Sequence, residues 1–136
     1  MKQRRTIKNT LLLPSILVLA GCVAGGMFFD HSAPSTISCK EEAPINLTVS
    51  VNAGDARSLD AQLHYRLSGS LDNSFLRVPM IKTKSKKKEA EFEYSIPAPG
   101  LDATGKYIEA FFEITGPHTE DHSFYLKDTM LEIAIK

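Results

Sequence analysis

Residues 45–51 read INLTVSV, and this stretch indicates the fold class. Every second residue from Ile45 to Val51 is apolar, and the residues between them are polar. Successive side chains of a β-strand point to opposite faces of the sheet, so a period of two predicts a strand with one buried face. Residues 52–55, NAGD, follow with the composition of a turn. The pattern therefore predicts a half-buried strand that ends near Val51.

The same alternation recurs along the rest of the chain, with turn-forming residues between the segments. The further expected strands are residues 61–67, 75–82, 92–96, 106–115, 122–127 and 130–135. Pro79 has no N–H to donate to a strand ladder, so its strand is expected at a sheet edge or a bulge. Seven short strands without a helical segment predict an all-β, antiparallel, seven-strand sandwich.

Three segments carry a resemblance to a known class of domain. They are YRLSGSLDNSFLRVPM (65–80), EFEYSIP (91–97) and GKYIEAFFEI (105–114). Their order of a Tyr-Arg pair, a Pro-Met strand end, an Ile-Pro strand end and an aromatic-rich strand resembles bacterial immunoglobulin-like or fibronectin III-like modules. The resemblance spans about residues 60–115 and implies an immunoglobulin-like sandwich that binds or spaces other proteins. Trp is absent, and no disulfide is expected, which excludes an antibody-type domain.

The N-terminal segment has the layout of a secretory signal. Residues 1–10 are polar and basic, and residues 11–20, LLLPSILVLA, are almost entirely apolar. A membrane-spanning helix needs about 20 apolar residues. The run from Leu11 to Val23 is shorter and contains Pro14. We therefore expect residues 1–21 to be removed as a signal peptide.

The end of this apolar run is more specific. Leu19-Ala20-Gly21-Cys22 resembles the lipobox of bacterial lipoprotein precursors at all four positions. The resemblance implies that signal peptidase recognises Leu19, Ala20 and Gly21 and that Cys22 becomes acylated. Two or more acyl chains anchor a protein stably. Membrane lipid is therefore the first expected partner.

The residue after Cys22 and the segment that follows suggest a location and a spacer. Asp at this position is the familiar inner-membrane signal of Gram-negative lipoproteins, and Val23 stands there instead. The resemblance implies a lipid-anchored membrane protein and, in a Gram-negative cell, favours the outer membrane with the domain facing the periplasm. Residues 22–44 are expected to form the lipidated N-terminus and a flexible tether, and residues 45–136 the sandwich domain. Within the tether, residues 27–29, MFF, are expected to enter the membrane interface or to pack on the domain.

Charge and cysteine content limit the possible partners. Removal of residues 1–21, which hold four of the sixteen basic residues, leaves twelve basic and sixteen acidic residues, a net charge of −4. A nucleic-acid-binding domain would carry net positive charge, so nucleic acid is excluded. Acylation of Cys22 would leave Cys39 as a lone thiol that could bridge to a partner. Inert burial or harmless exposure of Cys39 is the favoured expectation. A Cys22–Cys39 disulfide is the rival interpretation.

Two charged segments have both a functional and a structural interpretation. His118, Glu120, Asp121 and His122 could ligate Zn or Cu, but Gly and Pro just before them favour a polar turn, and no cofactor is expected. Five lysines between residues 82 and 88 could contact anionic lipid, lipopolysaccharide or an acidic partner. A solvated hairpin, in which these lysines pair with the glutamates of residues 89–93, is the favoured alternative.

One face of the expected strand 106–115 is unusual. Tyr107, Glu109, Phe111 and Glu113 share the face opposite the core. Exposed aromatic rings beside carboxylates suit a peptide, glycan or protein contact. The alternative is that a neighbouring loop or the tether covers them. The candidate partner surface is therefore this group of four residues.

The functional hypothesis follows from the expected membrane location and the expected fold. We expect a membrane-anchored envelope lipoprotein that acts as a non-enzymatic interaction or assembly module with a protein partner. The sequence has no G-x-S-x-G elbow and no recognisable acid/base pair of carboxylates, which argues against an enzyme. The alternative hypothesis is a periplasmic small-ligand or metal-binding lipoprotein that uses residues 118–122.

Overall fold

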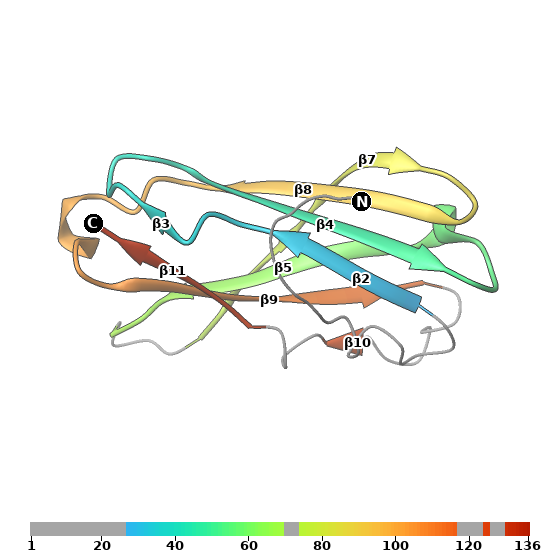
Figure 1. Cartoon of the computed structure of the whole chain (residues 1–136). Helices are drawn as coiled ribbons and strands as arrows, with labels where there is room; N and C mark the ends of the chain where they lie inside the picture. Colours follow the sequence, from blue (N-terminus) through green and yellow to red (C-terminus); the bar gives the residue numbers. More distant parts are fainter. Residues whose placement is uncertain (1–26, 70–73, 117–123, 126–129) are drawn as a thin grey trace.

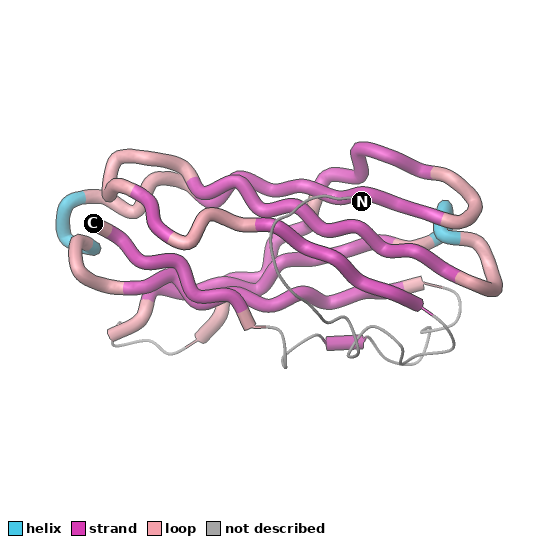
Figure 2. Tube along the Cα trace, viewed as in Figure 1, coloured by secondary structure: helices cyan, strands magenta, loops and turns pink. Residues whose placement is uncertain are grey.

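The computed structural model describes residues 27–69, 74–116, 124–125 and 130–136. Two β-sheets lie face to face along their length (Figure 1). Strands make up most of the described chain, and two short 3₁₀ turns, Ala56–Ser58 and Leu101–Ala103, lie at opposite ends of the sandwich (Figure 2). The all-β prediction is therefore confirmed.

The described strands are distributed between a four-stranded and a six-stranded sheet. The first has the order β2 (Met27–Ser32), β4 (Ala43–Val51), β8 (Glu89–Ile96) and β7 (Ile81–Ser85). The second has the order β3 (Thr36–Ile37), β11 (Leu131–Ile135), β9 (Tyr107–Thr115), β5 (Asp60–Leu67) and β6 (Leu76–Pro79), with β10 (Phe124–Tyr125) also paired to β9. The described residues thus form ten strands, where seven were expected for the domain.

The strand order is that of an immunoglobulin sandwich. Strands β2, β4, β8 and β7 take the places of A, B, E and D, and β11, β9 and β5 take those of G, F and C. Strand β6 adds to the C edge. One pairing departs from the antiparallel expectation, because β3 runs parallel to β11 at the edge of the six-stranded sheet.

The core lies between the sheets and follows the alternation of the sequence. The inward residues of β4 from Ala43 to Val51 are all buried. Phe92 of β8 and Phe112 of β9 approach the core from opposite sheets and are 1% and 0% exposed. Each such side chain contributes about 1.5–3 kcal/mol on burial. The predicted inner faces of β4, β8 and β9 are confirmed.

The expected tether is wrong from Met27 onward. Residues Met27 to Ser32 form β2, which pairs in register with β4 from Val51 to Asn46. Met27 is 6% exposed, and Phe29 packs against the core. Only two apolar side chains of β2 alternate before its polar end, which is too short a pattern to separate an edge strand from a linker. Residues 27–32 therefore belong to the sandwich, which was expected to begin at residue 45, and Met27 and Phe29 pack on its core.

Two other expected strands also differ. The stretch 75–82 is divided at Met80, where the chain leaves β6 in one sheet and enters β7 in the other. Met80 is buried, and its N–H donates to the carbonyl oxygen of Ala61 at 2.9 Å, which fixes the crossing. Pro79 ends an edge strand, as expected. Of the strand expected at 122–127, only residues 124–125 lie within the described part of the chain.

The structure describes Cys39 but not Cys22. Cys39 is a buried free cysteine, which agrees with the expectation of an inert thiol. Cys22 and the lipobox lie outside the described residues, so lipidation stays a prediction. None of the helices in the described ranges has the length and apolar character needed to cross a bilayer.

Candidate functional site on the outer face of the six-stranded sheet

The candidate site lies on the face of the six-stranded sheet that points away from the other sheet. Leu63 and Phe112 point into the core, so their neighbours along β5 and β9 point outward. We call the resulting group the outer-face cluster. Its members are His64 and Arg66 of β5, Phe75 and Arg77 at β6, and Glu109, Phe111 and Glu113 of β9.

Strand register brings these side chains together. His64 lies opposite Phe111 on β9 and opposite Arg77 on β6. Arg66 lies opposite Glu109. Side chains directly opposite in an antiparallel pair have Cβ atoms about 5 Å apart, so each pair is in contact range.

Glu113 is the centre of the polar part of the cluster. Its side chain is 2% exposed. Nε2 of His64 lies 2.7 Å from its Oε1 atom, and Arg77 donates from Nε to Oε1 at 3.0 Å and from Nη2 to Oε2 at 3.3 Å. The donor and acceptor roles in the His64–Glu113 contact depend on the tautomer of the imidazole, whereas the guanidinium of Arg77 can only donate. These bonds offset the cost of removing the carboxylate from water.

The aromatic part of the cluster is stacked on the polar part. The Phe111 ring lies parallel to the His64 ring, with a centroid distance of 4.5 Å and an interplanar angle of 8°. Phe75 contacts Phe111 edge-on at 5.0 Å. The Arg66 guanidinium lies 4.2 Å from the centroid of Phe75, and its Nε donates to Glu109 at 2.9 Å. The rings and ion pairs therefore hold one another in place.

The candidate partner surface is only partly exposed. Tyr107 is 51% exposed, and the Glu109 side chain is 22% exposed. Phe111 and Glu113 are 5% and 1% exposed, so the expectation that these two form an open surface is wrong. His64, Phe75 and Arg77 contact them from β5 and β6. The residues shown to cover Phe111 and Glu113 lie on β5 and on or beside β6, whereas the alternative named a neighbouring loop or the tether. Tyr107 remains exposed.

Sequence reasoning missed His64, Arg66, Phe75 and Arg77 as members of this site. Alternation along residues 61–67 already put His64 and Arg66 on the outer face. Their contacts depend on the pairing of β5 with β9, which are more than 40 residues apart in the sequence. No local pattern encodes that register, so the pairs appear only in the folded chain.

The lysine-rich hairpin behaves partly as expected. Nζ of Lys84 lies 3.0 Å from Oε2 of Glu89 and 3.5 Å from Oε2 of Glu91, so the predicted cross-hairpin pairing is confirmed at Lys84. The hydrogen bond from Lys84 lowers the pKa of Glu89 and raises the pKa of Lys84. Lys86, Lys87 and Lys88 are exposed at the hairpin tip.

A groove of about 400 Å³ lies between the β2–β3 connection and β11. It is lined by residues 31–35 and 131–133, which include His31 and Glu132. The described residues contain no group of three or more His, Cys, Asp or Glu side chains arranged to hold a metal ion. The metal candidates His118, Glu120, Asp121 and His122 lie outside the described residues.

Comparison with known proteins gives similarity in fold only. No family model and no curated protein matches the chain. A superoxide reductase (neelaredoxin) from Ignicoccus hospitalis is 14% identical with a TM-score of 0.41, over 79% of this chain and 80% of that chain. The CARDB domain of a Pyrococcus furiosus protein, in complex with di-metal ions, is 13% identical with a TM-score of 0.40, over 80% of this chain and 91% of that chain.

The sporulation control protein Spo0M from Bacillus subtilis is 14% identical with a TM-score of 0.43, over 82% of this chain and 50% of that chain. Similarity at this level transfers no activity to the chain. One of the similar structures is nevertheless an enzyme, the superoxide reductase. The expectation from missing motifs that the chain is not an enzyme is therefore corrected, because fold and motif content do not exclude one.

Proposed function

We propose that this chain is a lipid-anchored envelope protein whose immunoglobulin-like sandwich binds another envelope protein through the outer face of its six-stranded sheet. The lipobox resemblance at Leu19-Ala20-Gly21-Cys22 supports the anchor. Val23 supports the outer membrane, with the domain in the periplasm. The outer-face cluster supports the binding role.

The observation that carries the binding role is the exposed ring of Tyr107 beside a rigid group of charges. Tyr107 and Glu109 lie on the same face of β9, and Arg66 is held between Phe75 and Glu109. Tyr and Arg are enriched among the residues that dominate protein interfaces. Side chains that are already ordered lose less entropy on binding, so this group is suited to contact a partner.

The charge on this face favours a protein over a lipid surface as the occupant. Arg66 and Glu109 are an ion pair with side chains 28% and 22% exposed, so both signs of charge reach solvent. A lipid surface attracts one sign of charge, whereas a protein partner can present both signs in register. We therefore expect a folded or extended protein segment that contacts Tyr107 and its charged neighbours.

Crosslinking in intact envelopes tests the binding role. We expect Tyr107→Ala to lower partner capture at least about tenfold, as for an interface residue that contributes about 1.4 kcal/mol or more. Ile81→Ala is the matched control, because Ile81 is a large apolar residue, 63% exposed, on the other sheet. Equal capture by wild type and both variants would contradict the proposed face.

The anchor is tested separately by mass analysis of the mature N-terminus. We expect an acylated Cys22 as the first residue, and we expect Cys22→Ser to shift the chain from the membrane to the soluble fraction. Cys39→Ser is the control, because Cys39 is buried in the domain and should leave the location unchanged. A mature N-terminus other than acylated Cys22 would contradict the anchor.

A further inference from the structure

The end of the sandwich where β2 begins carries a concentration of positive charge. We call this end the entry pole, formed by residues 52–57 and 86–88. Val51 pairs with Met27, the first residue of β2, and its N–H donates to the carbonyl oxygen of Lys88 at 2.9 Å. Adjacent strands are about 4.8 Å apart, so the backbone of Lys88 lies about 10 Å from the start of β2. Figure 1 shows the turn between β7 and β8 at the same end of the sandwich as the start of β2.

The hairpin tip is fixed to this pole by its backbone. The N–H of Ala56 donates to the carbonyl oxygen of Lys87 at 2.7 Å, and Nζ of Lys88 donates to the carbonyl oxygen of Asn52 at 3.0 Å. Lys86 and Glu89 exchange two backbone hydrogen bonds across the turn. The turn that carries Lys86, Lys87 and Lys88 is therefore ordered; all three lysines are exposed, and the ammonium of Lys88 is held against Asn52.

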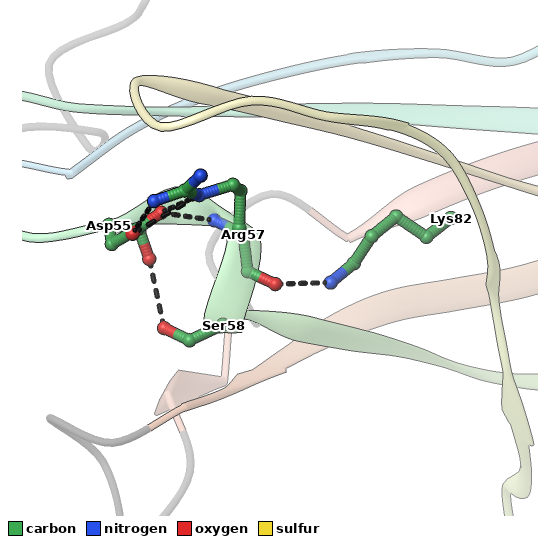
Figure 3. Close-up of polar contacts among 4 residues, drawn as sticks. All are labelled: Asp55, Arg57, Ser58 and Lys82. Atoms are coloured by element: carbon green, nitrogen blue, oxygen red, sulfur yellow. Dashed lines mark hydrogen bonds and ion pairs between the residues drawn. The ribbon is translucent and has the colours of Figure 1, made fainter.

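Other charges near this pole are largely compensated. The guanidinium of Arg57 forms an ion pair with the carboxylate of Asp55, and Nζ of Lys82 donates to the carbonyl oxygen of Arg57 (Figure 3). The charge of Lys82 is compensated by Asp60, whose Oδ1 lies 3.9 Å from Nζ. Hydrogen bonds from Arg57 lower the pKa of Asp55 to about 2, so this pair is ionised and neutral overall at pH 7. Lys84 is paired with Glu89.

Lys86, Lys87 and Lys88 differ from these neighbours in that their charges are not compensated by a carboxylate within the described residues. All three are exposed, and within the described ranges no carboxylate forms an ion pair with Lys86, Lys87 or Lys88. The opposite pole, formed by residues 38–42, 100–106 and Lys136, balances three lysines with three carboxylates. Among the described residues, the sandwich is therefore positive at one pole and neutral at the other.

The expected anchor, Cys22, lies close in sequence to the positive pole of the sandwich. Four residues separate Cys22 from Met27. The five steps from Cys22 to Met27 span at most about 18 Å when the chain is fully extended, because each step adds at most 3.6 Å. An acyl chain on Cys22 would hold the entry pole close to the headgroups. A tether of this length allows the lysines of the entry pole to reach the bilayer surface, where anionic lipid attracts Lys within about one Debye length.

We propose that Lys86, Lys87 and Lys88 form a second membrane contact that binds anionic phospholipid headgroups and orients the sandwich with its entry pole toward the bilayer. This inference rests on the proposed anchor at Cys22. A lipid surface is favoured over an acidic protein because the anchor brings a bilayer to this pole. The outer face of β9 then points sideways along the membrane, accessible to a neighbouring protein.

Vesicle partition tests the contact independently of what cells do to Cys22. The mature chain, residues 22–136, is coupled at Cys22 to a single myristoyl chain, while buried Cys39 is protected from coupling. One such chain gives marginal, reversible binding, so an added electrostatic contribution is measurable. Vesicles contain phosphatidylcholine alone, or with about 30 mol% phosphatidylglycerol to supply the anionic surface.

We expect tighter partition into the anionic vesicles, by about fivefold per lysine and on the order of 100-fold in total. Lys86→Gln, Lys87→Gln and Lys88→Gln together should remove this gain, as should about 0.5 M salt. The matched control replaces Lys40, Lys106 and Lys136 of the opposite pole by Gln. This variant should retain the tighter partition into anionic vesicles. All six side chains are at least partly exposed, so both variants should fold.

Three outcomes would overturn the proposal: equal partition into the two vesicle types, equal loss in the two triple variants, or a gain that salt leaves unchanged. Equal partition is also the result expected if this pole binds an acidic protein instead. Failure of the anchor would be detected by mass analysis of the mature N-terminus from cells, as a first residue other than acylated Cys22. The two failures are therefore distinguishable.

Discussion

Nε2 of His64 lies 2.7 Å from Oε1 of Glu113, and this contact joins β5 to β9 on the outer face of the six-stranded sheet. Glu113 is 1% exposed although it points away from the main core. The Phe111 ring stacks on His64 beside it, and Arg77 covers the carboxylate from β6. The outer face of β9 therefore has a buried half around Glu113 and an open half around Tyr107.

The two glutamates of β9 should differ in their contribution to stability. Glu113→Ala removes a buried acceptor of charged hydrogen bonds, and we expect it to lower the free energy of unfolding by about 2–3 kcal/mol. Glu109→Ala is the matched control, since the Arg66–Glu109 pair is partly exposed. Its expected cost is about 1 kcal/mol or less. Urea denaturation measures both values, and equal costs would contradict a buried centre at Glu113.

The fold was predictable wherever one strand face is uniformly apolar. Residues 45–51 identify β4, and Phe92 and Phe112 identify the inner faces of β8 and β9. Strand β2 was missed because Met27 and Phe29 are followed by a polar segment and resemble a linker. Met80 was missed as a crossing point because the residues on both sides of it continue one apolar stretch.

The candidate site was only half predictable for a related reason. Alternation identified Tyr107, Glu109, Phe111 and Glu113 as one face of β9. Burial of that face depends on cross-strand neighbours, and His64 is 49 residues from Glu113 in sequence. Local patterns indicate which residues share a face, but the long-range register decides which of them remain exposed.

Strand β2 should contribute to folding as part of the sandwich. Met27 is 6% exposed, so Met27→Ala should lower the free energy of unfolding by about 2 kcal/mol, the lower end for a buried Met→Ala change. Asp30 of the same strand is exposed, and Asp30→Ala should change it by less than about 0.5 kcal/mol. Chemical denaturation of the mature chain measures both. No effect of Met27→Ala would restore the interpretation of this segment as a tether.

Alkaline pH should weaken the contact between the two sheets at Tyr65. Burial and a hydrogen bond with Tyr94 raise the pKa of Tyr65 to about 12. An ordinary tyrosine has a pKa of about 10, so the unfolded chain releases this proton first as the pH rises. The stabilisation is therefore complete below pH of about 10 and is lost as the pH rises through about 12.

Denaturation between pH of about 9 and 12 checks this dependence. We expect the urea midpoint of the wild type to fall over that interval and Tyr65→Phe to fall less, because phenylalanine has no proton to release. Tyrosinate absorbance should show one phenol fewer titrating near pH 12 in Tyr65→Phe. Identical pH profiles for the two chains would contradict the assignment to Tyr65.

Cys39 should react with thiol reagents only when the sandwich opens. The residue is 7% exposed, its N–H donates to the carbonyl oxygen of Lys136 at 3.1 Å, and its own carbonyl accepts from Gly100 at 2.8 Å. A thiol must meet the reagent to react, and burial keeps the reagent away from Cys39. In a Cys22→Ser background, labelling should be at least about 100-fold slower in buffer than in denaturing urea, in line with the small population of open states. Equal rates would show that the strand ends around Cys39 are open in the native protein, contrary to the packing that joins it to Lys136.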